Sequence, residues 1–159
     1  YPLAIVGAGA LGLHFAARLA ACGPVAVIAR ESSRATALRA GVLVGERLFR
    51  AEAFGPDELP QADWVILLVK AGDTRAAART ALALGPRGVL SLQNGLTGQA
   101  LREVCGNLPA DQGITTEGAY RDSTRVVPSG AGETLVPPGF EAGREGLGRV
   151  IRAVPHEFL

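Results

Sequence analysis

Short apolar runs alternate along the chain with segments whose apolar residues recur at helical spacing. Residues 3–6 form the first run, and residues 25–29 form the second. Between them, apolar side chains fall on one face of a predicted helix: Phe15, Ala16, Leu19 and Ala20. The pattern predicts a strand, a helix and a second strand, which is the opening unit of a parallel sheet.

The same alternation continues to about residue 116. Residues 64–69 are apolar without interruption, which is typical of a strand buried on both faces in the middle of a parallel sheet. Further strands are predicted at 88–92 and 112–116, and helices are predicted at 32–40, 74–84 and 97–104. The sequence therefore predicts an α/β fold of the Rossmann type, with a doubly wound and mostly parallel sheet.

Other segments depart from this alternation. Residues 42–44 and 47–53 flank a Gly-Glu pair, and we expect them to form a hairpin. Short strands are predicted at 126–127 and 134–136, and we expect an antiparallel edge there. Residues 141–154 have helical spacing, although the three glycines among them lower their helix propensity.

A glycine-rich turn follows the first predicted strand directly and consists of Gly7, Ala8, Gly9, Ala10, Leu11 and Gly12. In such a turn, Gly7 permits a tight bend, Gly9 lets the backbone approach a pyrophosphate, and Gly12 lets the helix pack against the strand. The N-terminus of the helix then faces the phosphates. Because the turn joins a predicted strand to a predicted helix, we interpret it as a dinucleotide-binding fingerprint.

Arg30 ends the second predicted strand, where an NAD site usually carries an acidic residue for the ribose hydroxyls. A guanidinium suits the oxygens of a 2′-phosphate instead. Ser32, Ser33 and Arg34 add hydroxyl donors and a second positive charge, so the sequence favours NADP(H) over NAD(H). Two alternatives stay open, in which Arg30 is a solvated surface residue or Glu31 binds the ribose.

Composition narrows the possible functions. The chain is 48% hydrophobic with a net charge of +1 and no basic stripe, so no nucleic-acid partner is expected. The apolar runs are too short to span a membrane, and the first strand leaves no room for a signal peptide, so we expect a cytoplasmic protein. Cys22 and Cys105 are expected to be small buried side chains, and His14 and His156 to be structural, with no metal site.

Two polar residues follow the next predicted strands, at the edge where ligands bind in an open parallel sheet. Lys70 is the only lysine among sixteen Lys and Arg residues, and its ammonium can point a single charge at a carbonyl or carboxylate. Asn94 can both donate and accept, which suits a ribose or a substrate hydroxyl. The alternatives are a surface lysine that ends a strand and an asparagine chosen for its turn.

Several motifs, in this order, resemble the N-terminal domain of ketopantoate reductase, also called 2-dehydropantoate 2-reductase. They are the glycine-rich turn, Arg30, the Val69-Lys70-Ala71 strand end, the Gln93-Asn94-Gly95 turn, the threonine-rich segment 113–122, and the glycines of 130–134. The resemblance covers roughly residues 3–139. Each motif is weak alone, and together they are fairly specific.

The resemblance implies reduction of a 2-keto acid by NADPH, namely ketopantoate to pantoate in pantothenate biosynthesis. It implies that the cofactor is bound by residues 7–12, Arg30, Lys70, Asn94 and the backbone of Ala119, and that Lys70 and Asn94 also bind the substrate. The family's general-acid lysine is expected in a helical second domain. No residue of this chain is therefore assigned as catalytic.

The expected organisation is a Rossmann NADP-binding domain over residues 1–139, followed by a terminal helical segment over 140–159 that leads toward a missing domain. The chain as given is expected to bind the cofactor and to be incomplete for catalysis. Its expected partner is a small 2-keto acid, with a homodimer left open. A non-catalytic NADP(H) sensor and a reductase of another 2-keto acid are the alternatives.

Overall fold

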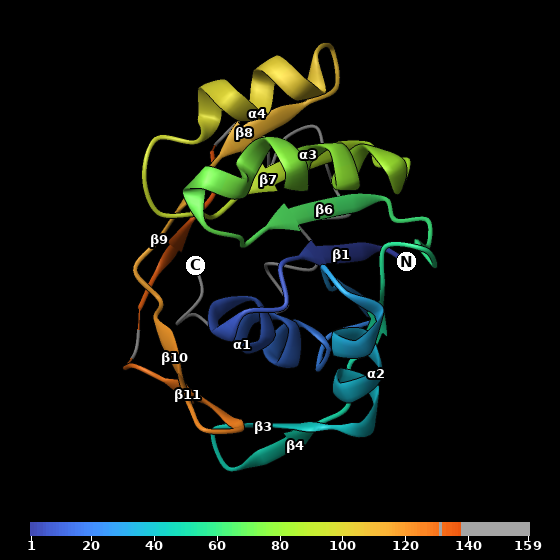
Figure 1. Ribbon diagram of the computed structural model, residues 1–159. Helices are drawn as coiled ribbons and strands as arrows, with labels where there is room; N and C mark the ends of the chain where they lie inside the picture. Colours follow the sequence, from blue (N-terminus) through green and yellow to red (C-terminus); the bar gives the residue numbers. More distant parts are fainter. Residues whose placement is uncertain (131, 138–159) are drawn as a thin grey trace.

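The computed structural model describes residues 1–130 and 132–137, and its centre is a six-stranded sheet in the order β5-β2-β1-β6-β7-β8 (Figure 1). Each neighbouring pair in this sheet is parallel. The strands are β1 Leu3–Val6, β2 Val25–Ile28, β5 Glu52–Phe54, β6 Trp64–Leu67, β7 Gly88–Ser91 and β8 Ala110–Gln112. The predicted Rossmann-type fold is confirmed.

Helices cover both faces of this sheet (Figure 1). They are α1 Ala10–Leu19, α2 Ser32–Ala40, α3 Thr74–Ala83 and α4 Gly98–Cys105, with a 3₁₀ turn η1 at Ala71–Asp73. The side chains of each strand alternate between two hydrophobic cores, so that Leu3 and Ile5 pack with α1 and α2, whereas Ala4 and Val6 pack with α3 and α4. Uninterrupted apolar strands thus follow from burial on both faces.

Two smaller sheets accompany the parallel sheet in the described part of the chain. One has the order β10-β11-β3-β4 and comprises β10 Ala119–Asp122, β11 Arg125–Pro128, β3 Val42–Val44 and β4 Arg47–Phe49. It packs on α1 through Val126, which is fully buried. The other pairs β9 Ile114–Thr115 with β12 Thr134–Leu135. As a result, β10, which is part of the threonine-rich segment 113–122, lies beside α1.

Three details of the strand predictions are wrong. The hairpin at 42–53 ends at Phe49, because the buried Ala53 lies in β5, which joins the parallel sheet beside β2. The strands at 126–127 and 134–136 form no edge of the parallel sheet, since β11 pairs with β10 and β3 while β12 pairs with β9. The strand at 112–116 is divided at Gly113, where a side chain would meet the Leu135 carbonyl oxygen at 2.6 Å.

The cysteine prediction is correct for Cys105, which is buried in α4, and wrong for Cys22, which is exposed in the turn after α1. Burial raises the pKa of the Cys105 thiol. The helix predicted at 141–154 and the second histidine, His156, lie outside the described residues. Among the described residues, no helix has the length and apolar character needed to cross a membrane.

Candidate functional site

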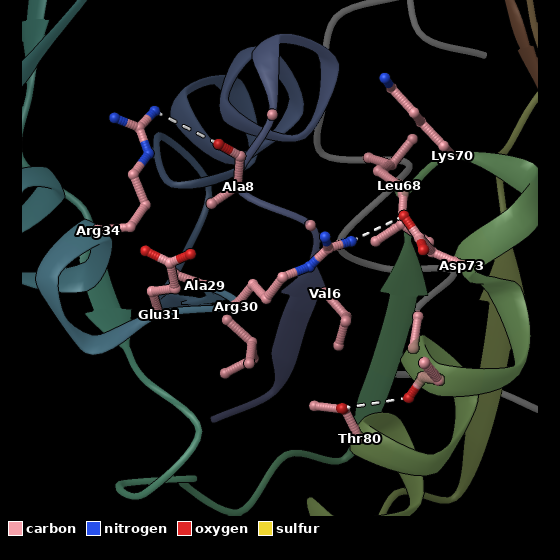
Figure 2. A pocket seen from close by; sticks show the side chains of 16 residues that line it. Val6, Ala8, Ala29, Arg30, Glu31, Arg34, Leu68, Lys70, Asp73 and Thr80 are labelled. Carbon is pink, nitrogen blue, oxygen red and sulfur yellow. Dashed lines mark hydrogen bonds and ion pairs between the residues drawn. The ribbon is translucent and has the colours of Figure 1, made fainter.

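A cavity of about 630 Å³ opens at the carboxyl ends of β1, β2 and β6 (Figure 2). Its walls come from the glycine-rich turn at 7–9, from the end of β2 with Arg34, and from residues 68–70 with Asp73 and one side of α3. These are the strand ends at which the sequence predicts a ligand. The structure brings together Gly7, Ala8, Gly9, Arg30 and Lys70 from the predicted set.

The glycines of the turn meet three different requirements. Gly7 has a φ of +127°, and a Cβ there would lie 2.5 Å from the Leu68 carbonyl oxygen. A Cβ at Gly12 would lie 1.9 Å from the Gly7 carbonyl oxygen, so α1 packs directly on the turn. A Cβ at Gly9 would meet no atom of the described residues within 4 Å, and this exposed backbone therefore borders open space in that part of the chain, at the mouth of the cavity.

The N-terminus of α1 carries the remaining predicted residues of the turn, Ala10 and Leu11. Hydrogen bonding within the helix begins with the Leu13 N–H, which donates to the Gly9 carbonyl oxygen at 3.0 Å. The N–H groups before it therefore form no hydrogen bonds within the helix. The first turn of α1 contains no acidic side chain. The positive end of the helix dipole is thus left for an anion.

Two arginines from the β2–α2 region line the cavity. The Arg30 guanidinium reaches toward α3 and forms an ion pair with the Asp73 carboxylate at 2.7 Å (Figure 2). The Arg34 guanidinium points the other way, toward the Ala8 carbonyl oxygen at 3.4 Å. Glu31 is exposed and also lines the cavity.

The surroundings of Arg34 disfavour its positive charge, and a bound anion would stabilise this charge. Partial burial lowers the pKa of Arg34, and the positive charge of Arg121 on β10 lowers this pKa further. The mutual repulsion of these two positive charges favours a negatively charged ligand near Arg34. Arg121 is not among the lining residues of the cavity. Its effect on Arg34 could not be predicted from the sequence, because the two residues are 87 positions apart.

Lys70 follows β6 as the N-cap residue of η1, is exposed and lines the cavity. Asn94 is exposed in the turn after β7 and is not among the lining residues of this cavity. Ala119 is half-buried on β10 and shares a hydrophobic cluster with Ala10 and Leu11, so it lies against the start of α1. The predicted residues thus divide into a group that lines the cavity and a group on neighbouring turns and strands.

The sequence of residues 3–139 matches the family model described as ketopantoate reductase PanE/ApbA. The chain belongs to this family. A 2-dehydropantoate 2-reductase of Archaeoglobus fulgidus is 31% identical over 139 residues, which cover 83% of this chain and 45% of that protein. The chain therefore spans less than half the length of this curated relative.

Solved structures agree with the family's fold. A PanE/ApbA family ketopantoate reductase from Ralstonia eutropha is 26% identical with a TM-score of 0.70, over 95% of this chain and 53% of that one. D-mandelate dehydrogenase, solved with NADH and anilino(oxo)acetate, is 21% identical with a TM-score of 0.72, over 95% of this chain and 54% of that one. The latter likeness shows the fold.

In this member of the ketopantoate reductase family, two glutamine side chains, from the buried Gln93 and from Gln112, hold the turns that carry Lys70 and Asn94. The Gln93 amide donates to the carbonyl oxygens of Val69 at 2.9 Å and Lys70 at 3.3 Å, which fixes the end of β6 to the end of β7. The half-buried Gln112 accepts from the first N–H groups of α4 and donates to the Gly95 carbonyl oxygen. The sequence shows that these amides follow strands, but not what they bind.

His14 of this family member is structural, as predicted, and its partner is Glu117. The His14 Nε2 and the Glu117 Oε2 lie 3.1 Å apart, and both side chains are almost completely buried. The Gly132 N–H donates to the other carboxylate oxygen of Glu117 at 3.2 Å. The pair therefore connects α1 to the segments at 117 and 132. Glu117 belongs to the threonine-rich segment 113–122, and its pairing with His14 could not be predicted from the sequence.

We expect the stability of this family member to fall below pH 6.5 because of His14. Burial lowers the pKa of His14, against the opposing effect of Glu117, so the unfolded chain binds a proton that the folded chain resists. The free energy of unfolding should drop by up to about 1.4 kcal/mol between pH 7.5 and 5.5. Urea denaturation of the wild type, His14→Leu and a His156→Gln control measures this slope, and an equal slope in His14→Leu contradicts the assignment.

Proposed function

We propose that this chain is the NADPH-binding part of a 2-dehydropantoate reductase, which reduces ketopantoate to pantoate for pantothenate synthesis. The observation that carries the proposal is the cavity at the ends of β1, β2 and β6, where the glycine-rich turn meets Arg30, Arg34 and Lys70. Membership of the ketopantoate reductase family and the identity to the Archaeoglobus fulgidus reductase support the same reaction.

The residues fit a dinucleotide. The open space beside Gly9 and the acid-free N-terminus of α1 suit a pyrophosphate, whose oxygens would accept from backbone N–H groups of residues 9–12. Arg30 and Arg34 suit a ribose phosphate, because both come from the β2–α2 region and both line the cavity. When bound, NADPH supplies the hydride. The protein groups bind and orient it.

The preference for NADPH over NADH depends on the two arginines. The fold neighbour D-mandelate dehydrogenase was solved with NADH, so the fold alone does not select the cofactor with the additional phosphate. In this chain, Glu31 is the residue that could accept from ribose hydroxyls. The cavity is lined by three cations and by two carboxylates, which are Arg30, Arg34, Lys70, Glu31 and Asp73. This excess of positive charge favours the additional phosphate.

Lys70 and Asn94 are proposed to bind the substrate and the nicotinamide half of the cofactor. The Lys70 ammonium can attract the carboxylate of a 2-keto acid and the negative charge that develops on its carbonyl oxygen during reduction. Gln93 holds the Lys70 backbone, which limits the positions that this charge can take. Residues 1–139 are proposed as the nucleotide-binding domain and 140–159 as a segment leading into a second domain, which contributes the general acid.

Arg30→Ala tests the cofactor assignment. We expect NADPH binding to weaken by about 1.5–3 kcal/mol, the range for a hydrogen bond to a charged group, while NADH binding stays unchanged. Isothermal titration of both cofactors measures the difference. Arg87→Ala is the matched control, because Arg87 is an exposed arginine that pairs with Asp63 and does not line the cavity. Equal loss of NADPH and NADH binding rejects the phosphate role.

Turnover tests the reaction itself. The longest available form of the protein should oxidise NADPH in the presence of ketopantoate, and this is followed at the absorbance of the reduced nicotinamide. NADPH binding without turnover of ketopantoate or other 2-keto acids supports a nucleotide sensor instead. A homodimer stays a prediction, which light scattering of the same sample measures.

A further inference from the structure

An ion pair crosses the cavity between two elements that are far apart in the sequence. Arg30 follows β2 and Asp73 lies in η1, and their charged groups are 2.7 Å apart. Both residues line the cavity, and Figure 2 shows the Arg30 side chain extended toward Asp73 and away from Arg34. The guanidinium that the proposed function assigns to a ribose phosphate is therefore already bound to an anion of the protein itself.

From this contact we propose that Asp73 is a specificity-determining residue of the nucleotide site, because its carboxylate competes with a ribose 2′-phosphate for Arg30. The inference rests on the proposed function. A carboxylate and a phosphate present similar pairs of oxygen atoms to a guanidinium. A given donor edge of the Arg30 guanidinium can therefore bind only one of them at a time. Asp73 thereby lowers the affinity for NADPH and leaves the affinity for NADH unchanged.

The ion pair is weak enough to be exchanged. The side chains of Arg30 and Asp73 are 76% and 42% exposed, and solvent screens pairs of this kind strongly. A phosphate carries more charge than a carboxylate and offers more acceptor oxygens. Exchange of Asp73 for the phosphate is therefore favourable, at the cost of the original pair.

Asp73 also lies at the N-terminus of α3. It is the N-cap residue of this helix, and its side chain makes no capping hydrogen bond. Its backbone ψ of 3° differs from the extended conformation that a capping residue typically has. Pairing with Arg30 therefore does not compete with a capping role, and the released carboxylate stays near the positive end of the α3 dipole.

Asp73→Asn tests the competition, since asparagine keeps the shape of the side chain but removes its charge. We expect the dissociation constant of NADPH to fall roughly two- to fivefold, the range that exposed ion pairs imply. The affinity for NADH should not change. Adenosine 2′-monophosphate should follow NADPH, because it carries the same ribose phosphate, and Asp73→Glu should restore the wild-type affinity.

Two controls identify the cause. Asp63→Asn removes a matched exposed aspartate that pairs with Arg87 outside the cavity, and it should leave both cofactor affinities unchanged. In an Arg30→Ala background, Asp73→Asn should no longer improve NADPH binding beyond the effect of Asp63→Asn. This dependence on Arg30 separates competition for the guanidinium from general repulsion of phosphate.

The outcomes distinguish the inference from the proposed function. Tighter NADPH binding by Asp73→Asn that depends on Arg30 supports the inference. If wild-type NADPH binding depends on Arg30 but Asp73→Asn leaves it unchanged or weaker, the inference is overturned and the proposed cofactor site stands. If Arg30→Ala leaves NADPH binding intact, the phosphate role of Arg30 fails, and the inference fails with it.

Discussion

Gly12→Ala should lower the free energy of unfolding by about 2–4 kcal/mol, as overpacking against rigid backbone does. The added Cβ would lie 1.9 Å from the Gly7 carbonyl oxygen, so either α1 or the glycine-rich turn must move. Alanine's better helix propensity offsets only about 1 kcal/mol of this cost. Urea denaturation measures the loss, and NADPH titration should show weakened binding because the displaced parts form the proposed phosphate site.

Gly9→Ala is the matched control for Gly12→Ala. A Cβ at Gly9 meets no atom of residues 1–130 and 132–137 within 4 Å, and Gly9 has a φ of −80°, which alanine adopts without strain. The free energy of unfolding should therefore stay within about 0.5 kcal/mol of the wild type. NADPH binding should still weaken, because the methyl group occupies space that a pyrophosphate needs. Unchanged stability in Gly12→Ala, or unchanged binding in Gly9→Ala, contradicts these separate roles.

His14→Leu should destabilise the fold by about 2–4 kcal/mol. Leucine removes the donor that faces the Glu117 carboxylate at 3.1 Å, in a place where water cannot replace it. The Gly132 N–H then remains as a partner of this carboxylate. Urea denaturation at pH 7.5 measures the loss, at which pH the titration of His14 contributes little.

The double variant His14→Leu/Glu117→Gln shows whether a buried charge causes the loss. A neutral amide is less costly to bury than a carboxylate, so the double variant should recover about 1–2 kcal/mol relative to His14→Leu. Glu117→Gln alone should cost less than His14→Leu, because the glutamine amide can still hydrogen bond to His14 and Gly132. No recovery in the double variant would assign the loss to packing of the histidine ring.

The order of strands and helices in the parallel sheet was predictable because each element is specified by residues that are close together in the sequence. Residues 3–6 and 64–69 are apolar on both strand faces, and burial between two helical layers is the arrangement that accommodates them. The glycine-rich turn was predictable for the same reason. Its demands at Gly7 and Gly12 come from backbone contacts between residues that are near in sequence or on adjacent strands.

The small sheets were less predictable because their strands are short and pair over long distances. Residues 52–54 continue the apolar alternation of the hairpin, yet they pair with β2 in the parallel sheet, where Ala53 is buried. The residues at 126–127 lie in β11, which pairs with β10 in the antiparallel direction and with β3 in the parallel direction. A two- or three-residue strand carries no pattern that selects its partner.

By itself, the sequence determined the parallel α/β core, the position of the glycine-rich turn and the strand ends at which Arg30 and Lys70 stand. Only the tertiary structure decided that Arg30 meets Asp73, that His14 meets Glu117 and that Gln93 holds the Lys70 backbone. Helical and strand periodicity follow from local backbone geometry and burial. The partner of a polar side chain is chosen by which elements the fold places opposite it, and no periodic pattern records that choice.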